Sequence, residues 1–263
     1  MKHVFIDQPK MRNNRFRLPS ILIFFLMFMS ICSGLHSQSL SGEKKDAQEI
    51  YRIVPTDDFE ITGKGENEKW NRADWLQLPR RRPVMAENSL STQMKAMYSE
   101  NGIYFLFICQ DKVLSSTMLA DFLDLWKEDV VEVFLWTDEE LPFYFEYEIS
   151  PLDYELPLLI SNENMELLRW QPFYYEENRK TKHATSVQGG QKKSGAEINS
   201  WTAEFFIPYK LLSPLKNVPP KKGTTWRANF YRNDYDSGSA SWSWKPVEKG
   251  YHEYDKFGVV LFE

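Results

Sequence analysis

The sequence predicts an all-β protein, a jelly-roll-like antiparallel β-sandwich of roughly ten or more strands. Short runs of β-branched and aromatic residues recur along the chain, and turn residues separate them. Helical patterns are few and weak. The 18 Phe, 13 Tyr and 9 Trp residues supply the large side chains that the core between two packed sheets needs.

Residues 1–37 have the three-part pattern of a secretory signal peptide. Basic residues come first, an apolar run over 21–31 follows, and small residues end the segment. We therefore expect an exported protein, located in the periplasm, on the cell surface or in the medium. An uncleaved anchor and a lipid anchor on Cys32 are the alternatives.

The rest of the chain is acidic and poor in cysteine. The whole sequence has a formal net charge of −5, and the basic leader contributes in the opposite direction. An acidic exported protein is a poor match for nucleic acid or an anionic membrane. Beyond the leader Cys109 stands alone, so no intrachain disulfide is expected. The one basic run, at 80–82, is interpreted as a solvated loop.

Residues 38–54 are expected to form a polar linker, and residues 55–263 a single β-domain. Asn101-Gly102 predicts a hairpin between strands at 93–98 and 102–110. A strand over about 129–136 is expected to pair with 143–150. A helical turn is expected over 209–212. The remaining expected strands cover 59–62, 156–160, 167–174, 184–188, 202–207, 225–232, 240–244 and 258–262.

Two glutamates stand in the middle of expected strands. Alternation places Glu132 on the same face as Val130, Phe134 and Trp136. Glu204 has a similar mid-strand position. A buried carboxylate is costly unless it is paired, so we favour internal pairing of both with an arginine or a tyrosine hydroxyl. A glycosidase pair and a calcium site are the alternatives. Carboxylates considered for these roles are Glu128, Asp129, Glu132, Glu146, Glu148 and Glu204.

Two tryptophans and one late strand have the chemistry of sugar recognition. Trp126 and Trp244 each stand at a strand end among polar residues, where an indole can stack on a pyranose or simply pack at an edge. Arg227 and Asn229 share a strand face and could bind vicinal hydroxyls or a buried glutamate equally well.

Taken together, a series of motifs is similar to the family 9 carbohydrate-binding module and its DOMON-like relatives over about 55–263. The motifs are Phe59-Glu60-Ile61-Thr62-Gly63, Trp70-Asn71-Arg72-Ala73, Tyr104-Phe105-Leu106-Phe107, Trp126 with Glu128-Asp129-Val130-Val131-Glu132-Val133-Phe134, Tyr147-Glu148-Ile149-Ser150-Pro151, Trp201-Thr202-Ala203-Glu204, Trp226-Arg227-Ala228-Asn229-Phe230-Tyr231-Arg232, Trp244-Lys245-Pro246, His252 and Phe257-Gly258.

The resemblance implies a β-sandwich that holds a sugar between aromatic side chains, often with structural calcium and in association with glycoside hydrolases. We accordingly expect a non-catalytic, exported carbohydrate-binding protein that serves polysaccharide or oligosaccharide breakdown. No cofactor is required, and calcium is the metal considered, with Asp129, Glu132 and Glu148 as candidates. The expected ligand-binding residues are Trp126, Glu128, Arg227, Asn229, Arg232, Trp244 and His252.

Three other functions remain open at this point. One is hydrolysis of O-glycosyl bonds by paired carboxylates. A second is a haem-binding module of the DOMON type, with His252 and one of Met94, Met97 and Met118 as axial ligands. A third is a structural partner in the cell envelope. Neither the sugar nor the oligomeric state follows from the sequence.

Overall fold

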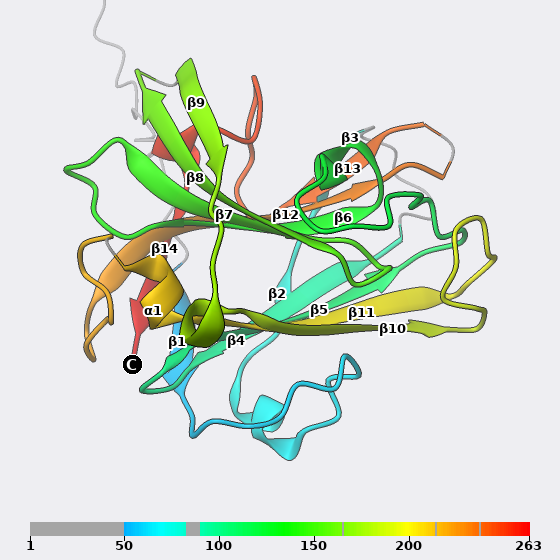
Figure 1. Cartoon of the computed structure of the whole chain (residues 1–263), viewed down its shortest axis with the longest axis horizontal. Helices are drawn as coiled ribbons and strands as arrows, with labels where there is room; N and C mark the ends of the chain where they lie inside the picture. The colour runs from blue at the N-terminus through cyan, green and yellow to red at the C-terminus, as the bar shows by residue number, and fades with distance from the viewer. Residues whose placement is uncertain (1–49, 83–89, 165, 214, 237) are drawn as a thin grey trace, which may run out of the picture. The chain divides into compact units, whose positions relative to one another are not determined.

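Two layers of β-strands form the fold, as Figure 1 shows. The computed structural model describes residues 50–82, 90–164, 166–213, 215–236 and 238–263. These residues belong to one unit, Lys45–Glu263. The expected leader, with Cys32, lies outside the described residues. The predicted all-β sandwich is confirmed.

The upper sheet of Figure 1 carries, on its outer face, the candidate site described below. Its strand order is β14 (Gly258–Phe262), β12 (Thr225–Asp234), β6 (Val130–Trp136), β7 (Phe143–Ile149), β8 (Glu155–Glu163) and β9 (Glu166–Pro172). Beside β12 lies β13 (Ala240–Ser243), which also pairs with β3 (Arg80–Arg82). The predicted pairing of β6 with β7 is confirmed.

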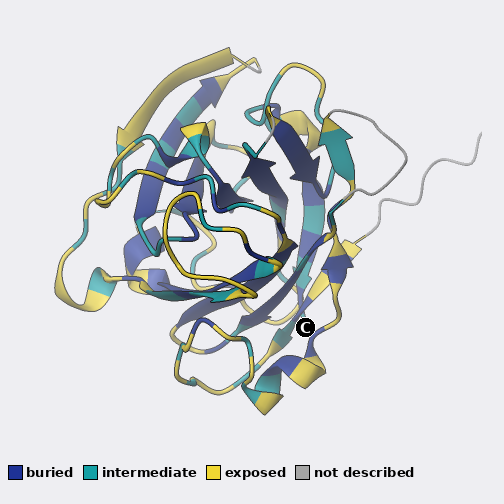
Figure 2. Ribbon diagram, turned by 90° about the vertical axis from the view of Figure 1, so that its right-hand side faces the viewer, coloured by how far each residue is buried: buried dark blue, intermediate teal, exposed yellow. Residues whose placement is uncertain are grey.

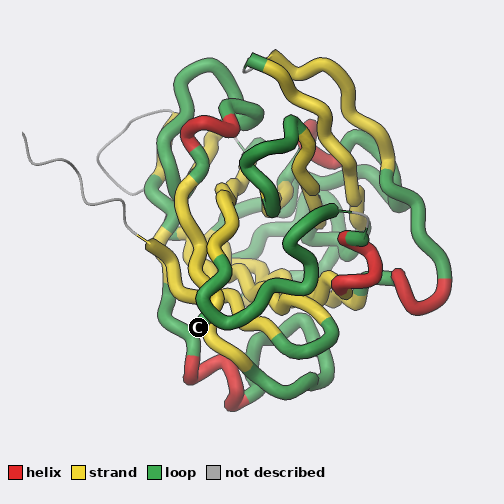
Figure 3. The backbone as a smooth tube through the Cα atoms, turned by 90° about the vertical axis from the view of Figure 1, so that its left-hand side faces the viewer, coloured by secondary structure: helices red, strands yellow, loops and turns green. Residues whose placement is uncertain are grey.

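The lower sheet has the strand order β10 (Lys182–Gln188), β11 (Ser200–Pro208), β5 (Gly102–Gln110) and β4 (Thr92–Tyr98), with β2 (Leu76–Gln77) paired to β4. The hairpin predicted at Asn101-Gly102 joins β4 and β5. The helices are short (Figure 3): η1 (Glu68–Arg72), η2 (Leu125–Lys127), η3 (Glu177–Arg179), η4 (Tyr254–Lys256) and the predicted turn α1 (Tyr209–Leu212). No helix in the described residues has the length and apolar character to cross a membrane.

Strand β1 (Ile50–Pro55) connects the two sheets. Residues Ile50–Ile53 pair in parallel with β14 of the upper sheet, and Val54 and Pro55 pair in parallel with β4 of the lower sheet. The expected linker over 38–54 therefore ends earlier than predicted. These parallel pairs also depart from a purely antiparallel sandwich.

The core lies between the sheets and is largely aromatic. Inward residues of β6, such as Val131 and Val133, meet inward residues of the lower sheet in one buried cluster. The rings of Tyr147 on β7 and Phe205 on β11 have centroids 4.8 Å apart. Figure 2 shows buried residues following most of the strands, whereas exposed residues gather in the loops and along β9.

Both outer faces are also covered. On the upper sheet, Val130, Phe134 and Tyr231 belong to a second buried cluster, so every residue of β6 is buried. On the lower sheet, Trp70 of η1 belongs to a third cluster. The site described below lies on the outer face of the upper sheet.

Two local predictions are wrong. Residues 59–62 form no strand, because Glu204 holds this segment against the lower sheet by accepting hydrogen bonds from the backbone N–H groups of Thr62 and Gly63 at 3.0 and 2.8 Å. The arginine run at 80–82 is strand β3 instead of a solvated loop, because β13 offers it a pairing partner.

Candidate functional site

A pocket of about 450 Å³ opens on the outer face of the upper sheet. Strand alternation places Glu132 of β6, Glu146 of β7 and Asn233 of β12 on this face. Loops and neighbouring strands complete it. The lining residues used below are Arg81, Arg82, Trp126, Glu132, Phe134, Glu146, Leu158, Trp170, Asn233, Ser243, Tyr251 and His252.

Two tryptophans form one wall of the pocket. Trp126 belongs to η2, where its backbone carbonyl accepts a hydrogen bond from the Tyr235 hydroxyl at 2.8 Å. Trp170 projects from β9 and is 44% exposed. Their ring centroids are 5.8 Å apart at an interplanar angle of 71°, so the rings meet edge to face. The ammonium of Lys127 lies 5.4 Å from the Trp126 ring centroid.

Tyr251 and His252 form a second wall from the loop before η4. The Tyr251 ring stacks on Tyr231 at 4.0 Å, and its hydroxyl donates to the side-chain oxygen of Asn233 at 2.6 Å. Nδ1 of His252 lies 2.6 Å from the Tyr144 hydroxyl. Burial lowers the pKa of His252 to about 4, so this imidazole is neutral at neutral pH.

Carboxyl groups form the floor. Glu132 accepts a hydrogen bond from the side-chain amide of Asn233 at 3.0 Å. Glu148 lies opposite Glu132 in the strand register, and Glu146 is the next outward residue on β7. Burial, with additional repulsion between neighbouring carboxylates, raises the pKa of Glu132 and Glu148, and burial raises that of Glu146. The floor is thus a group of acids that favour the protonated form.

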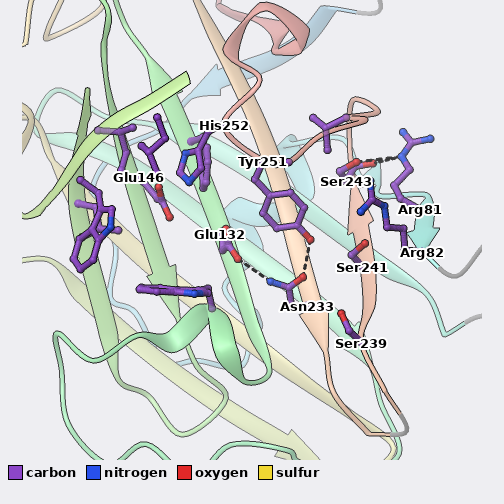
Figure 4. Close-up of a pocket in the computed structure, with 18 of the residues that line it drawn as sticks. Arg81, Arg82, Glu132, Glu146, Asn233, Ser239, Ser241, Ser243, Tyr251 and His252 are labelled. Carbon is purple, nitrogen blue, oxygen red and sulfur yellow. Dashed lines mark hydrogen bonds between the residues drawn. The ribbon is translucent and has the colours of Figure 1, made fainter. Parts of the chain in front are cut away.

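The opposite side of the pocket is basic and hydroxylated (Figure 4). The guanidinium of Arg81 donates to the backbone and hydroxyl oxygens of Ser243 at 3.2 and 3.1 Å and to the carbonyl of Trp244 at 2.7 Å. Arg82 donates to the carbonyl of Glu248 at 2.6 Å. Both arginines are therefore oriented by backbone acceptors.

Among the expected ligand-binding residues, the structure brings Trp126 and His252 into this pocket, together with Glu132. It places Glu128 in a loop, where its carboxylate accepts from the backbone N–H groups of Thr117 and Met118 at 2.5 and 2.9 Å. Arg227 donates to the carbonyl of Phe257 at 2.8 Å.

Three of the expected residues are buried among protein partners, which corrects the sequence-based assignment. Asn229 is fully buried and bonds to Tyr231 and to the backbone of Lys245. Trp244 is 4% exposed, and its ring stacks on Phe230 at 5.5 Å. A Cβ added at Gly258 would lie 2.4 Å from the Trp244 ring, so the two pack closely. Trp244 is a core residue and cannot offer a face to a ligand.

Arg232 faces the core and carries an internal ion pair. Its side chain is 0% exposed and lies 3.0 Å from Asp111 and 2.9 Å from Asp234. The arginine partner expected for Glu132 and Glu204 is therefore engaged elsewhere. The pairing of Glu204 is internal as predicted, but its partners are backbone N–H groups and the indole N–H of Trp70 at 2.8 Å.

The carboxylates that could share a metal ion in the described chain are Asp111, Asp234 and Asp236, whose ligand atoms lie within 4.8 Å of one another. These residues do not fit an obligatory calcium site, because Arg232 already supplies the positive charge between Asp111 and Asp234. Of the candidates named from sequence, Asp129 accepts from the backbone N–H groups of Ser115 and Tyr235 at 2.6 and 2.9 Å.

The described residues that line the pocket with His252 include no methionine. Met94 and Met97 are fully buried in clusters that include the lower sheet. Met118 is partly buried and packs against the outer cluster of the upper sheet without lining the pocket. His252 is engaged by Tyr144. The pocket residues that sequence reasoning missed are Trp170, Tyr251 and Arg81, since each reaches the site through long-range pairing or loop conformation.

Comparisons with known proteins agree with this fold. The model of the family "Carbohydrate family 9 binding domain-like" matches residues 61–263. An "Extracellular protein" of Arthroderma benhamiae is 30% identical over 112 residues, which are 41% of this chain and 47% of that protein. The match thus spans about half the length of the curated relative.

Two solved structures share the fold. A protein of Bacteroides uniformis ATCC 8492 to which carbohydrate binding is ascribed has 17% identity and a TM-score of 0.64, over 81% of this chain and 97% of that one. A family 9 carbohydrate-binding module of Caldicellulosiruptor kristjanssonii, solved with cellotriose, has 18% identity and a TM-score of 0.57, over 81% and 93%. At these identities the likeness concerns the fold.

Proposed function

The chain belongs to the carbohydrate family 9 binding domain-like family, and from this premise we propose that it is an exported, non-catalytic protein that binds carbohydrate in the pocket on the upper sheet. The observation that carries the proposal is the combination of Trp126 and Trp170 with Glu132 and Asn233 in one pocket. Indole faces suit the apolar face of a pyranose, and the polar groups suit its hydroxyls.

The geometry favours stacking on one indole at a time. A sugar between two plates needs two van der Waals gaps, about 7–8 Å in total. The centroids of Trp126 and Trp170 are 5.8 Å apart and the rings are steeply inclined. A pyranose therefore lies against one tryptophan while the other closes the edge of the site.

Calorimetry against a panel of mono- and oligosaccharides tests the proposal. We expect micromolar or weaker affinity. Loss of one stacking ring, in Trp126→Ala or Trp170→Ala, removes about 1–3 kcal/mol, or roughly ten- to a hundredfold in affinity. Trp75→Ala is the matched control, because Trp75 is 38% exposed and does not line the pocket. Binding by Trp126→Ala and Trp170→Ala at the wild-type level contradicts the proposed site.

Export and a role in polysaccharide breakdown form a second part of the proposal. The signal-like segment at 1–37 supports export, and the name of the Arthroderma relative is consistent with it. We expect the protein in a periplasmic, surface or secreted fraction, where it associates with glycoside hydrolases of the envelope. Cell fractionation tests the location, and retention of the full-length protein in the cytoplasm contradicts it.

Glycoside hydrolysis is the second candidate, because Glu132 and Glu146 line the same pocket. The raised pKa of both acids disfavours it at neutral pH, since neither supplies the ionised nucleophile or base that the reaction needs. Turnover of aryl glycosides that disappears in both Glu132→Gln and Glu146→Gln establishes the enzyme; absence of turnover by a protein that binds the corresponding sugar supports the binding module.

A further inference from the structure

The floor of the pocket contains more acid than a neutral sugar requires. Glu132, Glu146 and Glu148 are 2%, 4% and 0% exposed, and all three project from β6 and β7 to the same face of the sheet. One buried carboxylate oxygen of Glu146 has no donor from another residue type among the described residues, and Glu148 lies beside Glu146, so that the two acids interact with each other. Glu146 lines the pocket, and its side chain stands among the lining residues in Figure 4.

No basic side chain of the described chain neutralises these acids. None of its ion pairs includes Glu132, Glu146 or Glu148. Figure 4 shows Arg81 and Arg82 on the opposite side of the pocket, where both donate to backbone carbonyls. The nearby His252 is neutral. A buried carboxylate without a cation is costly, which is why these acids favour the protonated form in the free protein. A cationic ligand can supply the missing positive charge and stabilise the ionised form.

The walls next to this floor also suit a cation. Trp126, Trp170 and Tyr251 line the same pocket. Aromatic faces attract ammonium groups through their quadrupoles, and tryptophan does so most strongly. Acid and aromatic side chains in one pocket thus complement a ligand that is both apolar on its ring face and positively charged at one substituent.

We propose that the pocket takes a carbohydrate that carries a protonated amino group, a hexosamine without its N-acetyl group, with the ammonium placed on Glu146 and Glu132. The inference rests on the proposed function and names its ligand class. The ammonium donates to Glu146 and Glu132, and the sugar ring lies against Trp126 or Trp170. A hydroxyl or acetamide at the same carbon brings no charge, so the acids stay protonated and no ion pair forms.

The test is calorimetry with ligands that differ at carbon 2 alone. The monomers compared are glucosamine, glucose and N-acetylglucosamine, and in a second series galactosamine, galactose and N-acetylgalactosamine. For the glucose series, β-1,4-linked oligomers of equal length are compared as well. We expect the amino sugar of at least one series to bind about tenfold tighter or more, the factor that one charge-assisted hydrogen bond supplies. In Glu146→Gln, the affinity for that amino sugar should fall to within about twofold of the affinity for the corresponding hydroxyl sugar.

Glu163→Gln is the matched control, because Glu163 is exposed at the end of β8. Glu132→Gln is the second variant if Glu146→Gln does not fold. The inference is overturned, with sugar binding intact, if both amino sugars bind no more tightly than their hydroxyl counterparts. It is also overturned if the wild-type preference for the amino sugar persists in both Glu146→Gln and Glu132→Gln. Absence of binding to every sugar, in this series and in the wider panel, instead overturns the proposed function.

Discussion

The guanidinium of Arg232 lies 3.0 Å from the carboxylate of Asp111, and this contact joins the two sheets across the sandwich. Arg232 belongs to β12 of the upper sheet, whereas Asp111 directly follows β5 of the lower sheet. The same side chain donates to the carbonyl of Gln110 at 2.6 Å. Burial raises the pKa of Asp111, and the guanidinium opposes that rise. The contact is a buried ion pair beside a core of aromatic and aliphatic side chains.

Replacing Arg232 should destabilise the fold strongly. In Arg232→Met, Asp111 and Asp234 lose their common cation while buried, and such a loss typically costs about 3–5 kcal/mol. Arg227→Met is the matched control, since Arg227 lies on the same strand but its side chain is 17% exposed and faces outward. Urea denaturation measures both. A loss in Arg232→Met no larger than that in Arg227→Met contradicts this role.

Trp244 and Trp126 should separate stability from binding. Trp244→Ala removes a ring buried between Phe230 and Tyr51, and we expect a loss of about 3–5 kcal/mol in the free energy of unfolding. Trp126→Ala, at the partly exposed wall of the pocket, should cost less stability and more affinity. Denaturation and calorimetry on both variants check this. A Trp244→Ala protein of wild-type stability with lost sugar binding would restore Trp244 to the site.

His183 should make stability depend on pH above neutrality. Burial alone would lower the pKa of His183, but hydrogen bonds to Asp153 and Glu155 outweigh it and raise the pKa to about 10. Because the folded value exceeds the unfolded value of about 6.5, the stabilisation is complete below pH 6.5 and is lost as the pH rises to about 10. The loss has a slope of up to about 1.4 kcal/mol per pH unit.

Denaturation at pH 7, 8 and 9 measures this slope. His183→Gln should flatten the pH profile, since the titrating group is removed. His252→Gln is the control, because the pKa of His252 is about 4 and this side chain stays neutral throughout that range. Parallel profiles for wild type and His183→Gln show that the His183 pair does not contribute.

Metal removal should leave the fold stable. Arg232 already provides the charge among Asp111, Asp234 and Asp236, so a chelator should change Tm by less than about 2 °C. Differential scanning calorimetry with calcium and with EDTA measures this. A decrease of more than about 5 °C in EDTA indicates a structural metal site.

Local patterns predicted the elements whose partners lie nearby in the chain. Alternation on β6 and β7 placed Glu132, Glu146 and Glu148 on one face, and Asn101-Gly102 located a hairpin. Distant partners decide which of two neighbouring segments forms a strand. Residues 50–55 form β1 because β14 and β4 pair with them, whereas residues 59–62 form a loop that Glu204 holds. No local pattern encodes such a choice.

The site was only partly predictable for the same reason. The polar run Lys127-Glu128-Asp129, which follows Trp126 in the sequence, marks this tryptophan. Trp170 reaches the pocket through the β8–β9 hairpin, and its sequence neighbours do not mark it. Tyr251 reaches the pocket in the loop before η4, next to the predicted His252, but no local pattern shows that its ring faces the site. Trp244 has polar neighbours in the sequence, which suggested an exposed position. It is buried instead, because Gly258 of β14 and Phe230 of β12 pack against it.

The parallel pairing of β1 with β14 has a consequence for biosynthesis. Ile50 is placed opposite Val259, and Ile53 opposite Phe262, so a strand made early waits for one made about two hundred residues later. Closing so long a loop is slow, and unpaired strand edges persist until it closes. The sandwich should therefore complete its folding only after the ribosome has released β14, which leaves an interval in which the emerging chain remains open to a chaperone or an export machinery.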